Sequence, residues 1–316
     1  MKWNNVNKIS VGFVMHTLGI LLFAVSIVSV SPTSSIFAGN DAEEDSSNAQ
    51  IVAGNDTEEG FPATQIVGGH DALEGKYPYQ VSILHNYSPS CGGSIINSRF
   101  ILTAAHCIYN KNLKSIKVVA GTNFYAPGRG GVTYNAESLI WHSGYNKYRN
   151  LNDIGLIQVD REIIFFSKIQ PIALAETYYV AAGEIVVLTG WGRLTKNNML
   201  LTIPSKLQEI YLSVMSQSMC ESLVWEVTKN NICTNTTLST GACFGDSGSP
   251  VVLNGVQIGI VSYGHPCALG YPDVHTRVSP YGSWITLHAI NHGYLNRWSL
   301  LLLGISTLVS YSYSLS

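Results

Sequence analysis

Charge of either sign is scarce in this sequence, and neither sign prevails. Its 316 residues contain 18 Lys and Arg against 20 Asp and Glu, which gives a formal net charge of −2, and the basic residues form no run. A basic patch is the electrostatic signature of nucleic-acid binding, so the sequence offers no case for that class of partner. It also lacks a Cys-x₂-Cys pair and any cofactor motif. We therefore expect neither a metal nor a cofactor.

The first 31 residues resemble an export signal. Lys2 and Lys8 precede an apolar stretch, residues 9–30, that carries no charge. A positive flank before an apolar run is typical of a secretory signal. The run is longer than the core of an ordinary signal, and His16 interrupts it. Residues 1–31 are therefore either a cleaved signal peptide or a retained signal-anchor.

Export implies an oxidising compartment, in which cysteines pair. The chain has an even number of cysteines, which predicts three disulfides, although six cysteines allow 15 connectivities. They are Cys91, Cys107, Cys220, Cys233, Cys243 and Cys267. Sequons at Asn55 and Asn235 predict glycosylation of exported loops, whereas a third, at Asn86, is weakened by the following Pro89.

Residues 36–80 consist of three similar blocks. They read IFAGNDAEEDSSNAQ, IVAGNDTEEGFPATQ and IVGGHDALEGKYPYQ, and only the third continues into sequence typical of a strand. The period is too short for a solenoid, so a local duplication is the simpler explanation. Residues 39–60 are acidic and rich in Gly, Ser and Asn, which indicates a flexible leader.

From about residue 80 to 280 the pattern is one of short strands. Segments such as YQVSIL, GEIVVLTGW and VQIGIVSYG are rich in β-branched residues, and Gly and Pro separate them. Only at the end does a helical pattern appear, with Ser279 as expected N-cap and a helix over about 280–292. The fold class that follows is all-β and barrel-like, closed by a C-terminal helix.

The chain ends in an apolar extension, residues 293–316. Its last 19 residues, 298–316, contain no charge. One interpretation is a disordered or surface-packed tail. The other is a short membrane segment or a lipid-anchor signal, although the run is short and diluted by serine for a spanning helix.

The segment GACFGDSGSP, residues 241–250, contains a candidate nucleophile. Its serine, Ser247, stands between glycines on a tight turn. The backbone N–H groups of Gly245 and Ser247 can point the same way, and two such donors form an oxyanion hole. Taken alone, this turn could equally be an ordinary loop.

Two further segments supply the partners that a serine nucleophile needs. In LTAAHCIY, residues 102–109, His106 follows an apolar strand and stands beside Cys107. In LNDIGLIQV, residues 151–159, Asp153 opens an otherwise apolar strand, where a carboxylate is costly unless it is paired. A histidine accepts the serine proton, and a buried carboxylate fixes the tautomer of that histidine.

The motifs TAAHC, NDIGLI and GDSGSP, together with IVGG at 66–69 and GWG at 190–192, resemble the chymotrypsin/trypsin family of serine proteases. The segment GYPDVHTRV brings the chain nearest to insect chymotrypsin-like enzymes. The resemblance covers residues 66–292, which it implies are a protease domain of two six-stranded antiparallel β-barrels with the site between them. It implies catalytic roles for His106, Asp153 and Ser247. The disulfides that it implies are Cys91–Cys107, Cys220–Cys233 and Cys243–Cys267.

The same resemblance implies a zymogen. In the family IVGG is the mature N-terminus, so a cut before Ile66 would remove residues 32–65 as a propeptide and free an α-amino group to pair with Asp246. An activating protease and protein inhibitors are then expected partners of a monomeric enzyme. Gln65 departs from the Arg or Lys that usually precedes the cut, which leaves the activator undefined.

Position also indicates the pocket for the side chain before the scissile bond. Gly241 stands where trypsin-like members carry Asp, and the neighbouring walls are small, so we expect large apolar or aromatic side chains. A carboxylate at Asp273, usually Gly in the family, could instead narrow the pocket or attract a basic side chain. The expected lining is Gly241, Ala242, Ser262, Tyr263, Gly264 and Asp273.

The sequence thus predicts a secreted serine endopeptidase, made as a zymogen, that acts on protein or peptide substrates. Three alternatives stay open: trypsin-like or broad specificity through Asp273, a membrane-tethered form, and a catalytically silent homologue that only binds.

Overall fold

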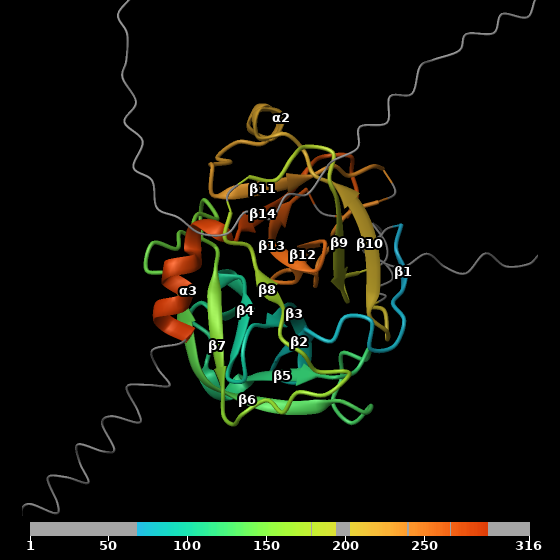
Figure 1. Ribbon diagram of the computed structural model, residues 1–316, viewed down its shortest axis with the longest axis vertical. Coiled ribbons are helices and arrows are strands. Elements are labelled where there is room, and N and C mark those ends of the chain that lie inside the picture. The colour runs from blue at the N-terminus through green and yellow to red at the C-terminus, as the bar shows by residue number, and fades with distance from the viewer. Residues whose placement is uncertain (1–67, 178, 194–202, 239, 266, 290–316) are drawn as a thin grey trace, which may run out of the picture. The chain divides into compact units, whose positions relative to one another are not determined.

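The structure is a computed structural model that describes residues 68–177, 179–193, 203–238, 240–265 and 267–289 (Figure 1). The expected signal, the leader up to Ile66 and the extension over 293–316 lie outside the described residues. None of the helices among the described residues has the length and apolar character that a membrane span requires.

The first half of the described chain is a closed barrel of six antiparallel strands, in the order β2-β3-β4-β7-β6-β5. Its interior consists of β-branched and leucine side chains, among them Ile83, Ile101 and Leu156, which are fully buried. Such residues favour a pleated, half-buried surface. The strands are β2 (Gln80–His85), β3 (Ser88–Ile95), β4 (Phe100–Thr103), β5 (Ile116–Ala120), β6 (Val132–Trp141) and β7 (Gly155–Val159).

The second half is a sheet of eight strands, in the order β1-β10-β9-β12-β13-β14-β11, with β8 paired to β13. An isolated bridge between Val214 and Thr234 also joins the end of β10 to β11. The strands are β1 (His70–Asp71), β8 (Ala173–Leu174), β9 (Ile185–Gly190), β10 (Gln208–Ser213), β11 (Asn231–Thr234), β12 (Pro250–Leu253), β13 (Val256–Gly264) and β14 (Asp273–Arg277). The all-β prediction is confirmed, with one closed barrel of six strands and a second sheet in which this bridge links the end of β10 to β11.

Helices are few and short. Those of the α type are α1 (Ala105–Ile108), α2 (Gln217–Leu223) and α3 (Gly282–Ala289), and two 3₁₀ turns cover Leu113–Ser115 and Ser279–Tyr281. The expected C-terminal helix exists, but Ser279 is not its N-cap. Ser279 and Pro280 lie inside the preceding 3₁₀ turn, because that tighter turn is compatible with a proline in its first positions.

Helix α3 packs on the closed barrel, next to β7 (Figure 1). Its buried residues, Ile285 and Ala289, join Tyr281 in the same apolar core as the barrel interior. A separate core fills the second half. The chain therefore crosses from the second sheet back to the first barrel before the described part ends.

Buried polar side chains join the two halves. Thr189 of β9 donates a 2.7 Å hydrogen bond to Gln80 of β2, and the Gln80 amide donates to Ser249 at 3.5 Å. Ser94 of β3 donates to Gln257 of β13 at 2.6 Å. Because buried polar groups are costly without partners, these contacts favour one relative placement of the barrel and the sheet.

The three disulfides have the pairing that the family resemblance implies. They are Cys91–Cys107, Cys220–Cys233 and Cys243–Cys267, so all six cysteines are paired and none is free. Cys91–Cys107 fastens α1 to β3, and Cys220–Cys233 fastens α2 to β11.

Candidate active site

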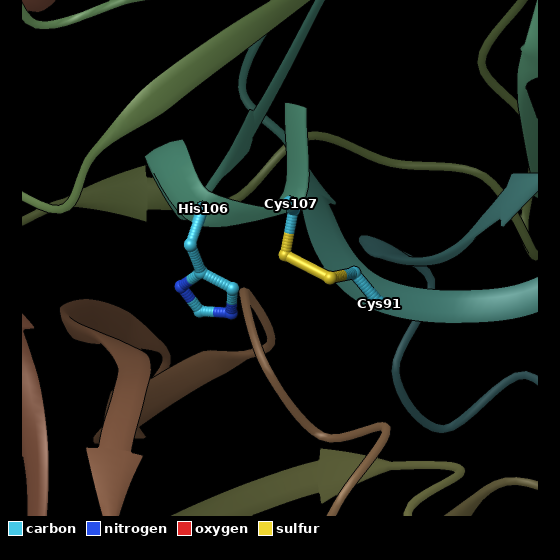
Figure 2. A group of neighbouring side chains, drawn as sticks. All are labelled: Cys91, His106 and Cys107. Carbon is cyan, nitrogen blue, oxygen red and sulfur yellow. A yellow bond between two sulfur atoms is a disulfide. The ribbon is translucent and has the colours of Figure 1, made fainter. Parts of the chain in front are cut away.

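His106 lies on α1, the short turn of helix that follows β4. The disulfide between its neighbour Cys107 and Cys91 of β3 fixes the backbone at this point (Figure 2). The ligand-type atoms of these three residues lie within 4.8 Å of one another. They do not make a metal site, because a metal needs thiolates and both sulfurs are consumed in the disulfide.

Asp153 is fully buried and meets His106 through two atoms. One carboxylate oxygen, Oδ1, accepts the backbone N–H of His106 at 2.9 Å, and Oδ2 lies 2.7 Å from the Nδ1 atom of its ring. A carboxylate at Nδ1 holds the proton on that nitrogen and leaves Nε2 as the acceptor. The pair therefore has the orientation of a general base and its support.

Ser262 completes the environment of the buried carboxylate. Its hydroxyl donates to Oδ2 of Asp153 at 2.5 Å, and the hydroxyl of Thr276 donates to the backbone carbonyl of Asp153 at 2.8 Å. The sequence indicated Ser262 as a pocket wall, but not this hydrogen bond. The two residues are 109 positions apart, so only the fold brings them together.

Ser247 lies in a loop that only glycines can form. Gly245 has φ = +105° and Gly248 φ = +78°, both in the region that residues with a Cβ seldom adopt. A Cβ on Gly248 would overlap Thr103 of β4, and one on Gly245 would lie 3.2 Å from the Cα of Gly192. Close packing against both halves of the molecule thus sets the position of Ser247.

Gly245 and Ser247, whose backbone N–H groups are the expected oxyanion-hole donors, line the same cleft. The N–H groups of Gly245 and Ser247 make no hydrogen bond to any residue in the described ranges. A cleft of about 360 Å³ is lined by Gly245, Ser247, His106 and Trp191 among others. Backbone N–H groups that have no partner of their own and lie beside a serine are the kind of donors that an oxyanion hole requires.

The structure brings His106 and Ser247 to one cleft but draws no hydrogen bond between them in the part of the chain that it describes. The side chain of His106 is 28% exposed, and Ser247 is partly exposed, so both are open to a substrate. Catalytic hydrogen bonds are often long without substrate and shorten in the complex.

Asp246 stands immediately before the serine and is completely buried. It accepts the backbone N–H of Gly192 at 2.8 Å and that of Cys243 at 3.0 Å. Gly190 and Gly192 leave space for it, since a Cβ at either position would overlap its oxygens. No cation among the described residues pairs with it, and burial raises its pKa to about 6 despite the two N–H donors.

A second cavity, of about 210 Å³, also has Ser247 in its lining. Five of the six predicted pocket residues line this cavity. The sixth, Gly241, does not line it but lies next to Asp273. A Cβ on Gly241 would stand 3.3 Å from the Oδ2 atom of that carboxylate. The lining is Ala242, Cys243, Phe244, Ser247, Val261, Ser262, Tyr263, Gly264, His265 and Asp273.

Phe244, Val261 and His265 are the lining residues that the sequence did not indicate. Phe244 stands within the GDSG-containing segment, so its place in the chain is a signal that could have found it. His265 follows β13 and stacks on Tyr271, with ring centroids 4.3 Å apart. With the half-buried ring of Tyr263, the rings of Phe244 and His265 give the cavity three aromatic side chains in its lining.

Comparison with known proteins gives a consistent match. The protein-family model described as Trypsin matches residues 66–285. Chymotrypsin-2 of Vespa crabro is 50% identical over 210 residues, which are 66% of this chain and 93% of that protein. Trypsin delta of Drosophila melanogaster is 36% identical over 218 residues, 67% of this chain and 84% of the relative. Trypsin alpha of Drosophila erecta is 37% identical over 214 residues, 66% and 81% of the two chains.

Proposed function

Because this chain belongs to the trypsin family of serine endopeptidases, we propose that it is a secreted protease, made as a zymogen, in which Ser247 is the nucleophile. The observation that carries the proposal is the pairing of buried Asp153 with the Nδ1 atom of His106, at the edge of a cleft that Ser247 also lines. The substrates are proteins or peptides.

In the proposed mechanism, the Oγ atom of Ser247 attacks the scissile carbonyl while Nε2 of His106 takes its proton. Asp153 keeps the ring in the correct tautomer and stabilises the imidazolium that forms. The N–H groups of Gly245 and Ser247 receive the developing negative charge on the carbonyl oxygen. His106 then donates its proton to the leaving amine, and water repeats the sequence on the acyl-enzyme.

We propose that the 210 Å³ cavity receives the side chain before the scissile bond, and that large apolar or aromatic side chains are preferred. Its support is the apolar and aromatic lining, which includes Phe244, Val261 and Tyr263. The name chymotrypsin-2 belongs to a relative of 50% identity, whereas the relatives named trypsin are 35–37% identical. The second candidate, preference for Lys or Arg, is favoured by the carboxylate of Asp273 in the same wall.

Zymogen activation belongs to the same proposal. A cut before Ile66 would create an α-amino cation, and the buried carboxylate of Asp246 has no cation among the described residues. A buried charge that lacks its partner costs about 3–5 kcal/mol. Pairing would therefore order the loop that carries Gly245 and Ser247. Gln65 stands where the family usually has Arg or Lys, so the activating protease is left undefined.

Secretion is proposed from the signal-like residues 1–31 and from the three disulfides, which form in oxidising compartments. Tethering by residues 293–316 is kept as a second form of the same enzyme, and detergent dependence of solubility would distinguish it. A silent binding homologue is less consistent with the geometry, because the histidine–carboxylate pair and the glycine-built loop are both present.

The proposal is tested by labelling with a fluorophosphonate. The chain is produced with a cleavable sequence before Ile66 and cut, and we expect Ser247 to be labelled. Ser247→Ala should abolish labelling, whereas Ser249→Ala, a buried serine two positions along, should keep it. A correctly cut and folded chain that takes no label would refute the enzymatic function. A peptide library then gives the preferred side chain before the scissile bond.

A further inference from the structure

The wall of the 210 Å³ cavity carries a carboxylate with an incomplete set of partners. We propose that the protonation state of Asp273 selects the class of side chain that the cavity accepts: basic when Asp273 is ionised, apolar or aromatic when it is protonated. This inference rests on the proposed endopeptidase function. According to this inference, the two candidate specificities belong to the ionised and the protonated form of the same pocket, and the pH determines which form is present.

Asp273 opens β14 and is 3% exposed. Its Oδ2 atom accepts the backbone N–H of Ala242 at 2.7 Å, and no other hydrogen bond or ion pair to its carboxylate is present among the described residues. Its Oδ1 atom lies against Gly264, where a Cβ would approach to 2.9 Å. An ionised carboxylate offers about four acceptor positions, so most of this one stays unused.

The groups that face Asp273 explain why its charge is weakly supported. Asp246, a second buried carboxylate from the loop that carries Ser247, acts on Asp273 electrostatically. Tyr263 of β13 and His265 of the turn after it line the same cavity as Asp273. On its own strand, His275 is completely buried, and burial lowers its pKa to about 3, so it stays neutral. The remaining neighbours, including Thr236 and Thr234 of β11, carry no charge.

Burial is therefore the main influence on this carboxyl group, and it raises the pKa of Asp273 to about 7. The N–H of Ala242 lowers the pKa in part, and the negative charge of Asp246 raises it. In the activated enzyme, pairing of Asp246 with the α-amino group of Ile66 would offset that charge. The midpoint should then lie below that of the uncut chain and above the ordinary value of about 4.

The two states favour different occupants for simple electrostatic reasons. When Asp273 is ionised, an entering ammonium or guanidinium group supplies the missing partner, and an apolar occupant would leave a desolvated charge beside it. When Asp273 is protonated, the wall is neutral, and the rings of Phe244 and Tyr263 favour an apolar occupant. Selectivity for Lys over Phe should thus rise with pH, by up to tenfold per pH unit, from a low plateau where Asp273 is protonated to a high plateau where it is ionised.

The experiment measures kcat/KM of the activated enzyme for two peptides that differ only in Lys or Phe before the scissile bond, from pH 5 to 9. The ratio of the two values is the readout, because titration of His106 affects both substrates equally and cancels. We expect the ratio to rise at least tenfold across the range, along a single titration curve.

Asp273→Asn provides the decisive comparison, since the amide oxygen can still accept the N–H of Ala242 but cannot ionise. Its ratio should be independent of pH and should stay at the low, Phe-favouring limit. Asp160→Asn, which changes an exposed aspartate at the end of β7, should keep the wild-type curve. Phe cleavage by Asp273→Asn shows that the variant is folded.

The outcomes separate this inference from the function on which it rests. A ratio that does not change with pH in the wild-type enzyme, or one that still changes in Asp273→Asn, overturns the pH-set selection and leaves the protease intact. Absence of cleavage of both peptides, together with absence of fluorophosphonate labelling, would instead contradict the proposed function itself.

Discussion

At the scale of single residues, the carboxylate of Asp153 receives more donors than a pairing with histidine alone would give it. The backbone N–H and the ring of His106 meet its two oxygens, and Ser262 donates to the oxygen that the ring also contacts. Hydrogen bonds to a buried charge contribute about 1.5–3 kcal/mol each. The orientation of the proposed general base therefore depends on a residue that also lines the 210 Å³ cavity.

Ser262→Ala should lower the rate of acylation about tenfold to a hundredfold, because Oδ2 of Asp153 loses a donor worth about 1.5–3 kcal/mol. The measurement is the second-order rate of fluorophosphonate labelling, which does not depend on the peptide pocket. Thr276→Val is the matched control, since it removes a hydrogen bond to the backbone carbonyl of Asp153 and not to its charge. Equal rates for the two variants would contradict this assignment.

The sequence was sufficient to propose the catalytic residues, because each lies in a short motif with its own chemistry. It was not sufficient to predict the hydrogen bonds and contacts that surround them. His106, Asp153 and Ser247 each stand in a recognisable segment. The bond from Ser262 to Asp153 and the contact of Gly241 with Asp273 join residues that lie far apart in the chain. Such contacts depend on the register of strands, which local patterns do not define.

At the scale of elements, α1 is a helix of only one turn, and it needs external support. It spans Ala105–Ile108 and has no side-chain cap at its N-terminus. Isolated helices of this length are unstable in water. The disulfide Cys91–Cys107 and the hydrogen bond from the His106 backbone to Asp153 therefore hold it in place.

Replacing both Cys91 and Cys107 by Ala should lower the free energy of unfolding by about 3 kcal/mol, the value expected for a loop of about 15 residues. It should also lower kcat, because the residue next to His106 loses its anchor. Urea unfolding and peptide hydrolysis, each on the oxidised protein, measure the two effects.

The matched control is Cys220→Ala with Cys233→Ala. That disulfide has a similar sequence separation, 13 against 16 residues, and neither cysteine lines the two cavities. A comparable loss of stability with little change in kcat is expected there. If both pairs affect kcat alike, the disulfide beside His106 has no special part in placing it.

At the scale of the whole molecule, the strand-rich pattern was sufficient to predict an all-β fold, and the family resemblance added the two-barrel arrangement. The first barrel closes, whereas the second sheet runs from β1 to β11 and is joined across by the bridge from Val214 to Thr234. Sequence patterning indicates which faces are apolar. It does not indicate how the ends of a sheet meet, because closure depends on twist and register summed over all strands.

The Ser247 loop makes hydrogen bonds to both halves of the described structure. The backbone carbonyl of Ser247 accepts the N–H of Gly92 of β3 at 2.8 Å, and Gly248 donates to Val261 of β13 at 2.8 Å. Asp246, the residue before Ser247, accepts hydrogen bonds from two backbone N–H groups. No cation within the described ranges pairs with it. The protonation state of Asp246 therefore acts on a loop that contacts both halves of the described structure.

The pH dependence of stability should reverse between the uncut and the cut chain. In the uncut chain the pKa of Asp246 is raised to about 6, above the 3.8 of an unfolded aspartate, so the folded state binds more protons between these values. Its contribution to stability is present below pH 3.8 and is lost as the pH rises through about 6. After the cut, the α-amino cation of Ile66 would lower that pKa, and the contribution would be present at neutral pH and lost on acidification.

Urea unfolding of both forms between pH 4 and 7, in a Ser247→Ala background that prevents self-cleavage, should show the cut form gaining stability relative to the uncut form as the pH rises. With Asp246→Asn added, the two profiles should run parallel; parallel profiles without that substitution would mean that the new N-terminus does not pair with Asp246.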